Sequence, residues 1–302
     1  MARARDLSLF VILALVWGGS FPAIKSGLEF FPPLQFAAVR YVLGGLLLLA
    51  YTLAVGSEWR PRVRDDWLAL AVTGVFLVAG NGMLFVGQQH TTSGVAAVIY
   101  SLIPILTTAI AWPLLPTERH SRLGLVGVTL GFVGVVVVVS PDPSNALSQD
   151  VVGRLIILAA AMSAAFGSVL IRRATPSFGI APMTAWGMLL GGPLLSVVGV
   201  ATGEPLSLGN PSIAGFVAMG YLVVLATALA YVIYFRLLDS LGALEVNLVS
   251  YVVPIVATVV GWALLAESVT VTTVGGFGLV LLGFVLLKRD ALVAELRPYV
   301  FG

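Results

Sequence analysis

The feature that most constrains the fold is a series of long apolar runs, each bounded by charged or turn-forming residues. One run of about 20 apolar residues can cross the hydrocarbon core of a bilayer as a helix. The runs do not alternate apolar and polar residues as barrel strands do, and a helix satisfies its own backbone groups in lipid. The sequence therefore predicts an all-α integral membrane protein with ten transmembrane helices, at about 7–27, 34–55, 67–88, 93–115, 122–140, 153–172, 181–201, 212–236, 243–265 and 271–288.

The composition supports this interpretation. Apolar residues make up 59% of the 302 residues and charged residues only 10%, whereas a soluble domain usually carries about 25% charged residues. One soluble core cannot hide so much apolar surface. We therefore expect the lipid bilayer to be the partner of most of the surface, with no room for a second soluble domain.

The basic residues orient the predicted helices. If the N-terminus is placed in the cytoplasm, every Lys and Arg except Lys25, Arg40 and Arg154 falls in or beside a cytoplasmic segment. Such enrichment of basic residues on the cytoplasmic side follows the positive-inside rule. The pattern predicts a multi-pass protein with both termini in the cytoplasm. The absence of an Asn-x-Ser/Thr acceptor site favours the cell inner (plasma) membrane of a prokaryote.

The second half of the chain repeats the first when it is shifted by 150 residues. Pro104 then coincides with Pro254, and Trp112 with Trp262. Because five is an odd number of spans, the second copy must be inverted. The sequence predicts a first five-helix repeat at 1–140, an external linker at 141–152, a second, inverted five-helix repeat at 153–290 and a short cytoplasmic tail at 291–302. Inverted repeats are typical of secondary transporters, in which two similar halves rock about a site near the midplane.

Several segments resemble EamA-type transporters of the drug/metabolite transporter superfamily. They are VWGGSFPAIKSGL at 16–28, PLQFAAVRY at 33–41, GVAAVIYSLIPILTTAIAWPLLPTE at 94–118 and LGALEVNLVSYVVPIVATVVGWALLAES at 241–268. The resemblance extends over about residues 7–288. The ending PLLPTE departs from the Leu-Gly-Glu ending usual in that family. The resemblance implies ten helices, a central cavity lined by helices 1, 3, 4, 6, 8 and 9, and export or exchange of amino acids or other small metabolites.

Polar and aromatic side chains inside the predicted spans are the candidates for substrate binding. A polar group at membrane depth is costly and needs a partner or a function. Amides and hydroxyls can bind the charged ends of a solute, and aromatic faces suit apolar groups or cations. Each residue can instead form a hydrogen bond between helices. The candidate substrate-binding residues are Trp17, Asn81, Tyr100, Ser163, Tyr231, Asn247 and Tyr251.

Prolines and glycines mark places where the predicted helices bend. Pro104 and Pro254 lie in the middle of two repeat-related spans, and proline removes one backbone hydrogen bond and bends a helix. They are predicted hinges, with static kinks as the alternative. The stretch 17–22 (WGGSFP) is expected to interrupt the first helix, or to let a neighbouring helix pack against Gly18 and Gly19.

Few charged residues lie within the predicted spans. Lys25 and Arg40 lie toward outer ends, where either could extend to lipid headgroups or attract an anionic solute. The first alternative is favoured for Lys25, and both stay open for Arg40. Glu267 is expected to cap a helix. No carboxylate falls at the centre of a span, so a proton relay built from acids is not predicted.

The remaining residues argue against other classes of function. The chain has no cysteine, its two histidines lie far apart in the predicted topology, and no nucleotide-binding or hydrolase motif occurs. We therefore predict no enzyme, cofactor, metal site or nucleic-acid partner. The prediction is a secondary transporter, monomeric or homodimeric, that exports or exchanges small organic metabolites, amino acids favoured, by alternating access. The alternatives are a drug, nucleotide or phosphosugar carrier of the same fold and, in another class, a passive channel or a lipid-handling membrane enzyme.

Overall fold

The computed structural model describes residues 2–114, 122–139, 148–174, 176–207 and 212–289. Over these ranges the secondary structure is helical, without strands. The first half contains α1 (Ala2–Gly27), α2 (Pro33–Ala54), α3 (Arg64–Val72), the π-helix η1 (Thr73–Ala79), α4 (Gly82–Gln88), α5 (Ser93–Tyr100), α6 (Ile103–Leu114) and α7 (Arg122–Val139). The second half contains α8 (Gln149–Ala174), α9 (Ile180–Ala201), α10 (Ile213–Gly220), the π-helix η2 (Tyr221–Leu229), α11 (Ala230–Leu241), α12 (Ala243–Asn247), α13 (Val249–Leu265) and α14 (Val271–Leu287).

Most of these helices are long and apolar enough to cross a membrane. Within the described ranges, eight helical segments meet that length and composition, and two apolar helices, Leu123–Val139 and Val271–Leu287, are shorter. Each of the ten predicted apolar runs therefore corresponds to a helical segment. The chain is a multi-pass membrane protein.

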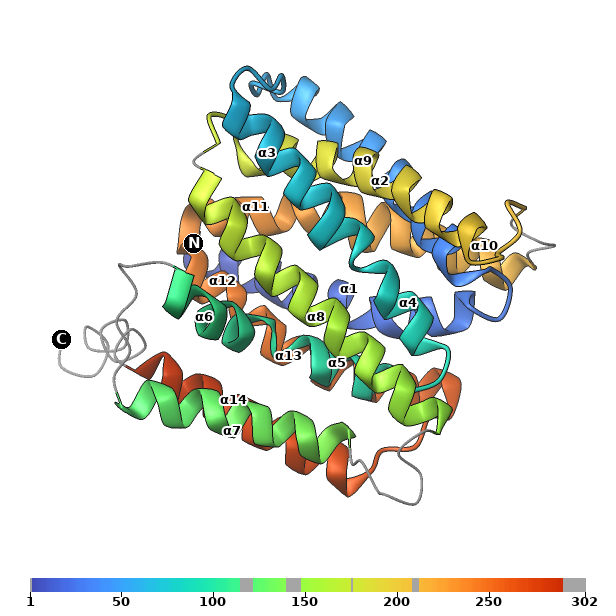
Figure 1. Ribbon diagram of the computed structural model, residues 1–302, viewed down its shortest axis with the longest axis vertical. Coiled ribbons are helices and arrows are strands. Elements are labelled where there is room, and N and C mark those ends of the chain that lie inside the picture. The colour runs from blue at the N-terminus through green and yellow to red at the C-terminus, as the bar shows by residue number, and fades with distance from the viewer. Residues whose placement is uncertain (1, 115–121, 140–147, 175, 208–211, 290–302) are drawn as a thin grey trace.

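The helices form one bundle whose two edges are antiparallel helix pairs (Figure 1). α2 packs against α9 at one edge, and α7 packs against α14 at the other. α1 lies between these edges and contacts α13, α11, η2, α10 and α5. α1 is thus the helix around which residues from both halves of the chain gather.

Glycines allow the α7–α14 pair to approach closely. A Cβ atom on Gly127 would lie 2.4 Å from the carbonyl oxygen of Gly283, and one on Gly134 would lie 2.7 Å from that of Gly276. The two contacts run in opposite directions along the chain, so the helices are antiparallel. Lipid gives no hydrophobic drive for helix association, and close backbone packing of this kind takes its place.

The structure differs from the sequence predictions at two places. α1 is continuous through residues 17–22 rather than interrupted. Gly18 instead makes room for α13, since a Cβ atom there would lie 2.4 Å from Val256 Cβ. α8 begins at Gln149, so residues 149–152 of the predicted linker are helical; residues 140–147 and the predicted tail lie outside the described residues.

Carboxylates cap helices at the end of the bundle where α1 and α4 finish. The Glu267 carboxylate accepts hydrogen bonds from Ser93 N and Ser93 Oγ at the start of α5, at 2.9–3.0 Å. Glu204 accepts from Leu34 N and Gln35 N at the start of α2. A carboxylate there satisfies free N–H groups and the helix dipole. The predicted capping role of Glu267 is confirmed.

Candidate functional site

Three aromatic rings from α1 and α11 form the apolar part of the candidate site. The ring centroids of Trp17 and Tyr234 are 5.4 Å apart, and those of Trp17 and Tyr231 are 5.8 Å apart. The Trp17 indole N–H donates to the carbonyl oxygen of Ala226 at 3.2 Å, which fixes the ring against η2. All three residues are only half-buried, so each keeps some accessible surface.

A hydrogen-bonded group of one amide and two phenols forms the polar part. Asn81 Nδ2 donates to the Tyr41 hydroxyl, and the Tyr100 hydroxyl donates to Asn81 Oδ1. These side chains come from α2, from the η1–α4 junction and from the end of α5. Asn81 and Tyr100 are half-buried, as the rings of the aromatic group are. Such a group can both donate to and accept from a polar solute.

Each of the two groups is positioned by a π-helix. η1 ends at Ala79, just before Asn81, and η2 ends at Leu229, just before Tyr231. Asn81 and Tyr231 also coincide when the chain is shifted by 150 residues. A π-helix turns the following side chains to a new direction, and such segments occur often at functional sites.

Arg40 of α2 is the buried charge of this region. Its side chain lies roughly 10 Å below the start of α2, at a rise of 1.5 Å per residue, and the residue is only 7% exposed. Its Nε donates to Thr227 Oγ1 at 3.3 Å. The guanidinium carbon lies 5.2 Å from the ring centroid of Tyr41 and 5.7 Å from that of Phe85. Arg40 thus does not extend to the headgroups.

The Arg40 charge faces the candidate site. Its guanidinium lies beside the Tyr41 ring, and the Tyr41 hydroxyl belongs to the hydrogen-bonded polar group. Ala226, which accepts from Trp17, and Thr227, which accepts from Arg40, are consecutive residues of η2. Consecutive residues lie 3.8 Å apart at their Cα atoms, so Trp17 and Arg40 are held to neighbouring points of one helix.

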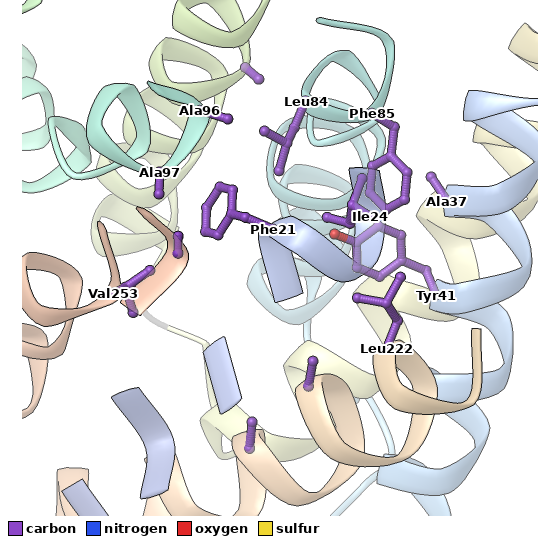
Figure 2. Close-up of a cluster of buried hydrophobic side chains, with 14 of the residues drawn as sticks. Phe21, Ile24, Ala37, Tyr41, Leu84, Phe85, Ala96, Ala97, Leu222 and Val253 are labelled. Atoms are coloured by element: carbon purple, nitrogen blue, oxygen red, sulfur yellow. The ribbon is translucent and has the colours of Figure 1, made fainter. Parts of the chain in front are cut away.

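Buried apolar side chains from α1, α2 and α4 pack together beside the polar group (Figure 2). Phe21 and Ile24 of α1, Tyr41 of α2 and Phe85 of α4 belong to one buried cluster. The ring of Phe21 lies edge-on to that of Tyr100, with centroids 6.1 Å apart. The Phe21 ring thus packs against the Tyr100 end of the polar group.

The structure brings together some of the predicted site residues and separates others. Trp17, Asn81, Tyr100 and Tyr231 lie in the groups described above. Asn247 adjoins them, because its amide oxygen accepts from the Tyr234 hydroxyl at 3.5 Å.

Ser163 and Tyr251 lie apart from these groups. Ser163 Oγ donates to the carbonyl oxygen of Phe76 at 2.8 Å and links α8 to η1. Tyr251 is 5% exposed and packs on Phe284 of α14, with ring centroids 4.3 Å apart. Its hydroxyl has no hydrogen-bond partner in the described part of the chain.

Of the two predicted hinge prolines, Pro104 lies beside an interruption in its helical segment and Pro254 lies inside α13. Pro104 follows a break at 101–102 between α5 and α6, and Pro254 follows a break at Leu248 between α12 and α13. Lys25, at the end of α1, donates to the carbonyl oxygens of Gln88 and Gln89, each at 3.0 Å, rather than to headgroups. Among the residues described, no three metal-ligating side chains gather.

Comparison with known proteins decides the family. The model of the EamA-like transporter family matches residues 6–140 and again residues 151–289. The chain belongs to the EamA-like transporter family. The sequence-based expectation of that family is therefore confirmed, and the family points to a transporter rather than an enzyme.

Other members and a solved structure are similar along nearly the whole chain. The inner membrane transporter YedA of Escherichia coli K12, itself uncharacterized, is 31% identical over 95% of this chain and 92% of its own length. The S-adenosylmethionine/S-adenosylhomocysteine transporter of Chlamydia trachomatis serovar L2 is 28% identical over 94% and 90%. A solved crystal structure shares the fold, with a TM-score of 0.65, 19% identity and coverage of 95% of this chain and 98% of the other.

Sequence reasoning missed three residues of the site. Tyr41 and Tyr234 were not among the predicted site residues, and Arg40 was left between two alternatives. One signal in the sequence could have identified Arg40 as a residue of the candidate site. It lies several residues inside a predicted span rather than at the end of that span.

Proposed function

We propose that this protein is a secondary transporter of the inner membrane that exports or exchanges small organic metabolites, with amino acids favoured. The observation that carries the proposal is the half-buried set of Trp17, Asn81, Tyr100, Tyr231 and Tyr234. It combines aromatic faces with amide and hydroxyl groups inside a bundle of apolar helices. Small-molecule sites have this character, mostly apolar with a few placed polar groups.

The proposed topology has ten spans in two inverted five-helix repeats, with both termini in the cytoplasm. α7 and α14 are short, but 17 residues suffice for a span. Contacts between helices of the two halves have counterparts made by the repeat-related helices. The contact of α1 with α13 corresponds to that of α8 with α6 and α5. The contact of α2 with η2 corresponds to that of α9 with η1. The family model also matches once in each half. A pseudo-twofold arrangement accounts for all of these observations.

The proposed mechanism is alternating access about the site. The site lies where α1, α2, α4, α5 and α11 meet, so a movement of one half against the other exposes it to opposite sides in turn. The breaks before Pro104 and Pro254 interrupt the two helical segments that contact α8 and α1, respectively. Bending at these two places moves the helix ends while the middle of the bundle stays packed.

The chemistry of the site favours an amino acid or a derivative of one. An ammonium group suits the faces of Trp17 and Tyr234 and the Asn81 amide oxygen. An apolar or aromatic side chain suits the same rings. The chlamydial relative is named as a carrier of S-adenosylmethionine, which is itself an amino acid derivative. A drug carrier of the same fold is the second candidate, favoured by the aromatic rings alone.

Counterflow in liposomes tests the proposal. Purified protein is reconstituted, each vesicle population is loaded with one unlabelled amino acid, and uptake of the same labelled amino acid is followed. A carrier gives transient, saturable accumulation that requires internal substrate. A channel gives only equilibration, and a membrane enzyme gives neither. Absence of counterflow with every amino acid, drug and metabolite in a broad panel would contradict the proposal.

A further inference from the structure

We propose that Arg40 is the residue that recognises the substrate, and that it binds a carboxylate carried by a singly charged anionic or zwitterionic solute. This inference rests on the proposed transport function and adds to it the chemical group that the solute must carry. It concerns a residue in α2, a helix that the resemblance does not place in the lining of the cavity.

The first argument is the cost of placing this charge where it lies. Arg40 is more than nine-tenths buried within a membrane-spanning helix. Charged residues inside a membrane protein are expensive and normally pair with one another or lie on a substrate path. Arg40 forms no ion pair within the described residues, so its charge is not neutralised by the protein there.

The second argument is the number of donors that stay free. A guanidinium has five N–H groups, and only Nε has a hydrogen-bond partner in the described part of the chain, namely Thr227. The Thr227 hydroxyl in turn donates to the carbonyl oxygen of Leu222 at 2.7 Å. The side chain is therefore anchored through Nε, and the two terminal nitrogens are left for a ligand. Those two nitrogens form the fork that binds a carboxylate in two parallel hydrogen bonds.

The third argument is that the fold holds Arg40 in this position. Gly44, one turn further along α2, lets η2 approach, since a Cβ atom on Gly44 would lie 2.5 Å from Thr227 Cγ2. The rings of Tyr41 and Phe85 lie beside the guanidinium. A side chain fixed in this way loses little freedom when a ligand binds.

The charges nearby favour a monoanion over a phosphate. Lys25 is engaged by two carbonyl oxygens, and Arg154 is engaged by Asp150 and by the carbonyl oxygens of Val138 and Val139. Arg40 is therefore the one fixed positive charge facing the aromatic and polar groups in the described part of the bundle. A dianionic phosphate bound to Arg40 would keep one uncompensated negative charge in a poorly solvated site. The single negative charge of a carboxylate is balanced by the single positive charge of Arg40.

The positions of the groups suit an amino acid. Trp17 and Arg40 bond to consecutive residues of η2, so we place a solute with its carboxylate on Arg40 and its other end toward the aromatic group. The ammonium group and the side chain then lie toward Trp17 and Tyr234. In this arrangement, α2 binds the carboxylate of the solute, and α1 and α11 contact its ammonium group and side chain through aromatic rings.

Equilibrium binding to the full-length protein in detergent tests this assignment. The probes are L-phenylalanine, 3-phenylpropanoate, which keeps only the carboxylate, phenethylamine, which keeps only the amine, and phenyl phosphate. We compare the wild type with Arg40→Gln, Arg40→Lys and the control Arg62→Gln, whose side chain is exposed in the α2–α3 loop. Size-exclusion elution and thermal melting verify that each variant is folded.

The assignment predicts that Arg40→Gln weakens the binding of ligands with a carboxylate and of no others. Arg40→Gln should weaken binding of L-phenylalanine and 3-phenylpropanoate at least about tenfold, as expected for a lost charged hydrogen bond. Phenethylamine binding should not weaken. Arg40→Lys should recover part of the loss, and Arg62→Gln should match the wild type.

Three results would overturn the assignment. They are equal carboxylate binding by folded Arg40→Gln, no carboxylate binding by the wild type, and tighter binding of phenyl phosphate than of 3-phenylpropanoate. Carboxylate binding that depends on Arg40 in a protein without counterflow would instead support the assignment and contradict the transport function.

Discussion

At the scale of single residues, the direction of a side chain separates those that can bind a solute from those that hold the bundle together. Asn81 and Tyr100 bond to each other and keep accessible surface. Ser163 bonds to a backbone carbonyl of a neighbouring helix, and Tyr251 packs in a second apolar cluster with Phe284. All four were predicted site residues, because each is polar and lies within an apolar run.

We expect Tyr251→Phe to leave transport unchanged and to keep or raise stability. The change removes a buried hydroxyl that has no hydrogen-bond partner in the described residues, and an unsatisfied buried polar group costs about 1–3 kcal/mol. Thermal melting in detergent and a transport assay measure the two effects. A transport rate lowered tenfold or more would place Tyr251 in the substrate site.

At the scale of helices, the packed edges differ from the interrupted helices in how closely their backbones are held together. The α7–α14 pair is joined by glycines along its length. The segment α5–α6 is broken beside Pro104, and the segment α12–α13 is broken more than one turn before Pro254. The edges are therefore suited to stay fixed, and the broken helices are suited to move.

Gly283→Ala should lower stability while Gly278→Ala should not. A methyl group on Gly283 would lie 2.5 Å from the carbonyl oxygen of Gly127, whereas one on Gly278 of the same helix meets open space. Overpacking of this kind costs roughly 1–3 kcal/mol. Thermal melting of the two variants gives the comparison, and equal melting midpoints would contradict the close packing of α7 on α14.

The double variant Pro104→Ala with Pro254→Ala should slow exchange without abolishing binding. Alanine restores the backbone donor that proline lacks and favours a straighter helix. We expect the counterflow rate to fall several-fold while the dissociation constant changes little. An unchanged rate would show that the bundle does not bend at these places.

How much the sequence could predict differs between the fold and the site. Helix positions such as Pro33–Ala54 and Ile180–Ala201 agree with the predicted runs within a residue or two, since a span is defined by apolar length. The direction of Ser163 or Tyr251 was not predictable, because uniformly apolar helices carry no polar stripe to indicate the face that points inward. The anchoring of Arg40 was not predictable for a related reason: Thr227, which accepts its hydrogen bond, is 187 residues away in the sequence.

At the scale of the whole molecule, the proposed inverted repeat predicts the side of the membrane on which each loop lies. Ser207, before α10, should lie outside, and Ser240, at the end of α11, should lie in the cytoplasm. The two are separated by one helical segment, Ile213–Leu241, that is long enough to span. The ten proposed spans, an even number, also predict that both termini lie on the same side.

Cysteine labelling can verify this topology directly, because the chain has no cysteine of its own. In intact cells, a membrane-impermeant maleimide should label Ser207→Cys and spare Ser240→Cys, which should react only after the cells are opened. Both positions are exposed. Labelling of both from outside, or of Ser240→Cys alone, would contradict the orientation.

The most direct test of the central claim, that the half-buried aromatic and polar groups are the binding site of a carrier, is counterflow by Asn81→Ala beside Ser163→Ala. Asn81→Ala removes the amide that joins Tyr41 and Tyr100, and we expect counterflow to fall at least about tenfold, as for lost substrate hydrogen bonds. Ser163→Ala removes a bond between helices, worth roughly 0.6 kcal/mol in membranes, and should transport as the wild type does. Normal counterflow by Asn81→Ala, or loss only in Ser163→Ala, would contradict the claim.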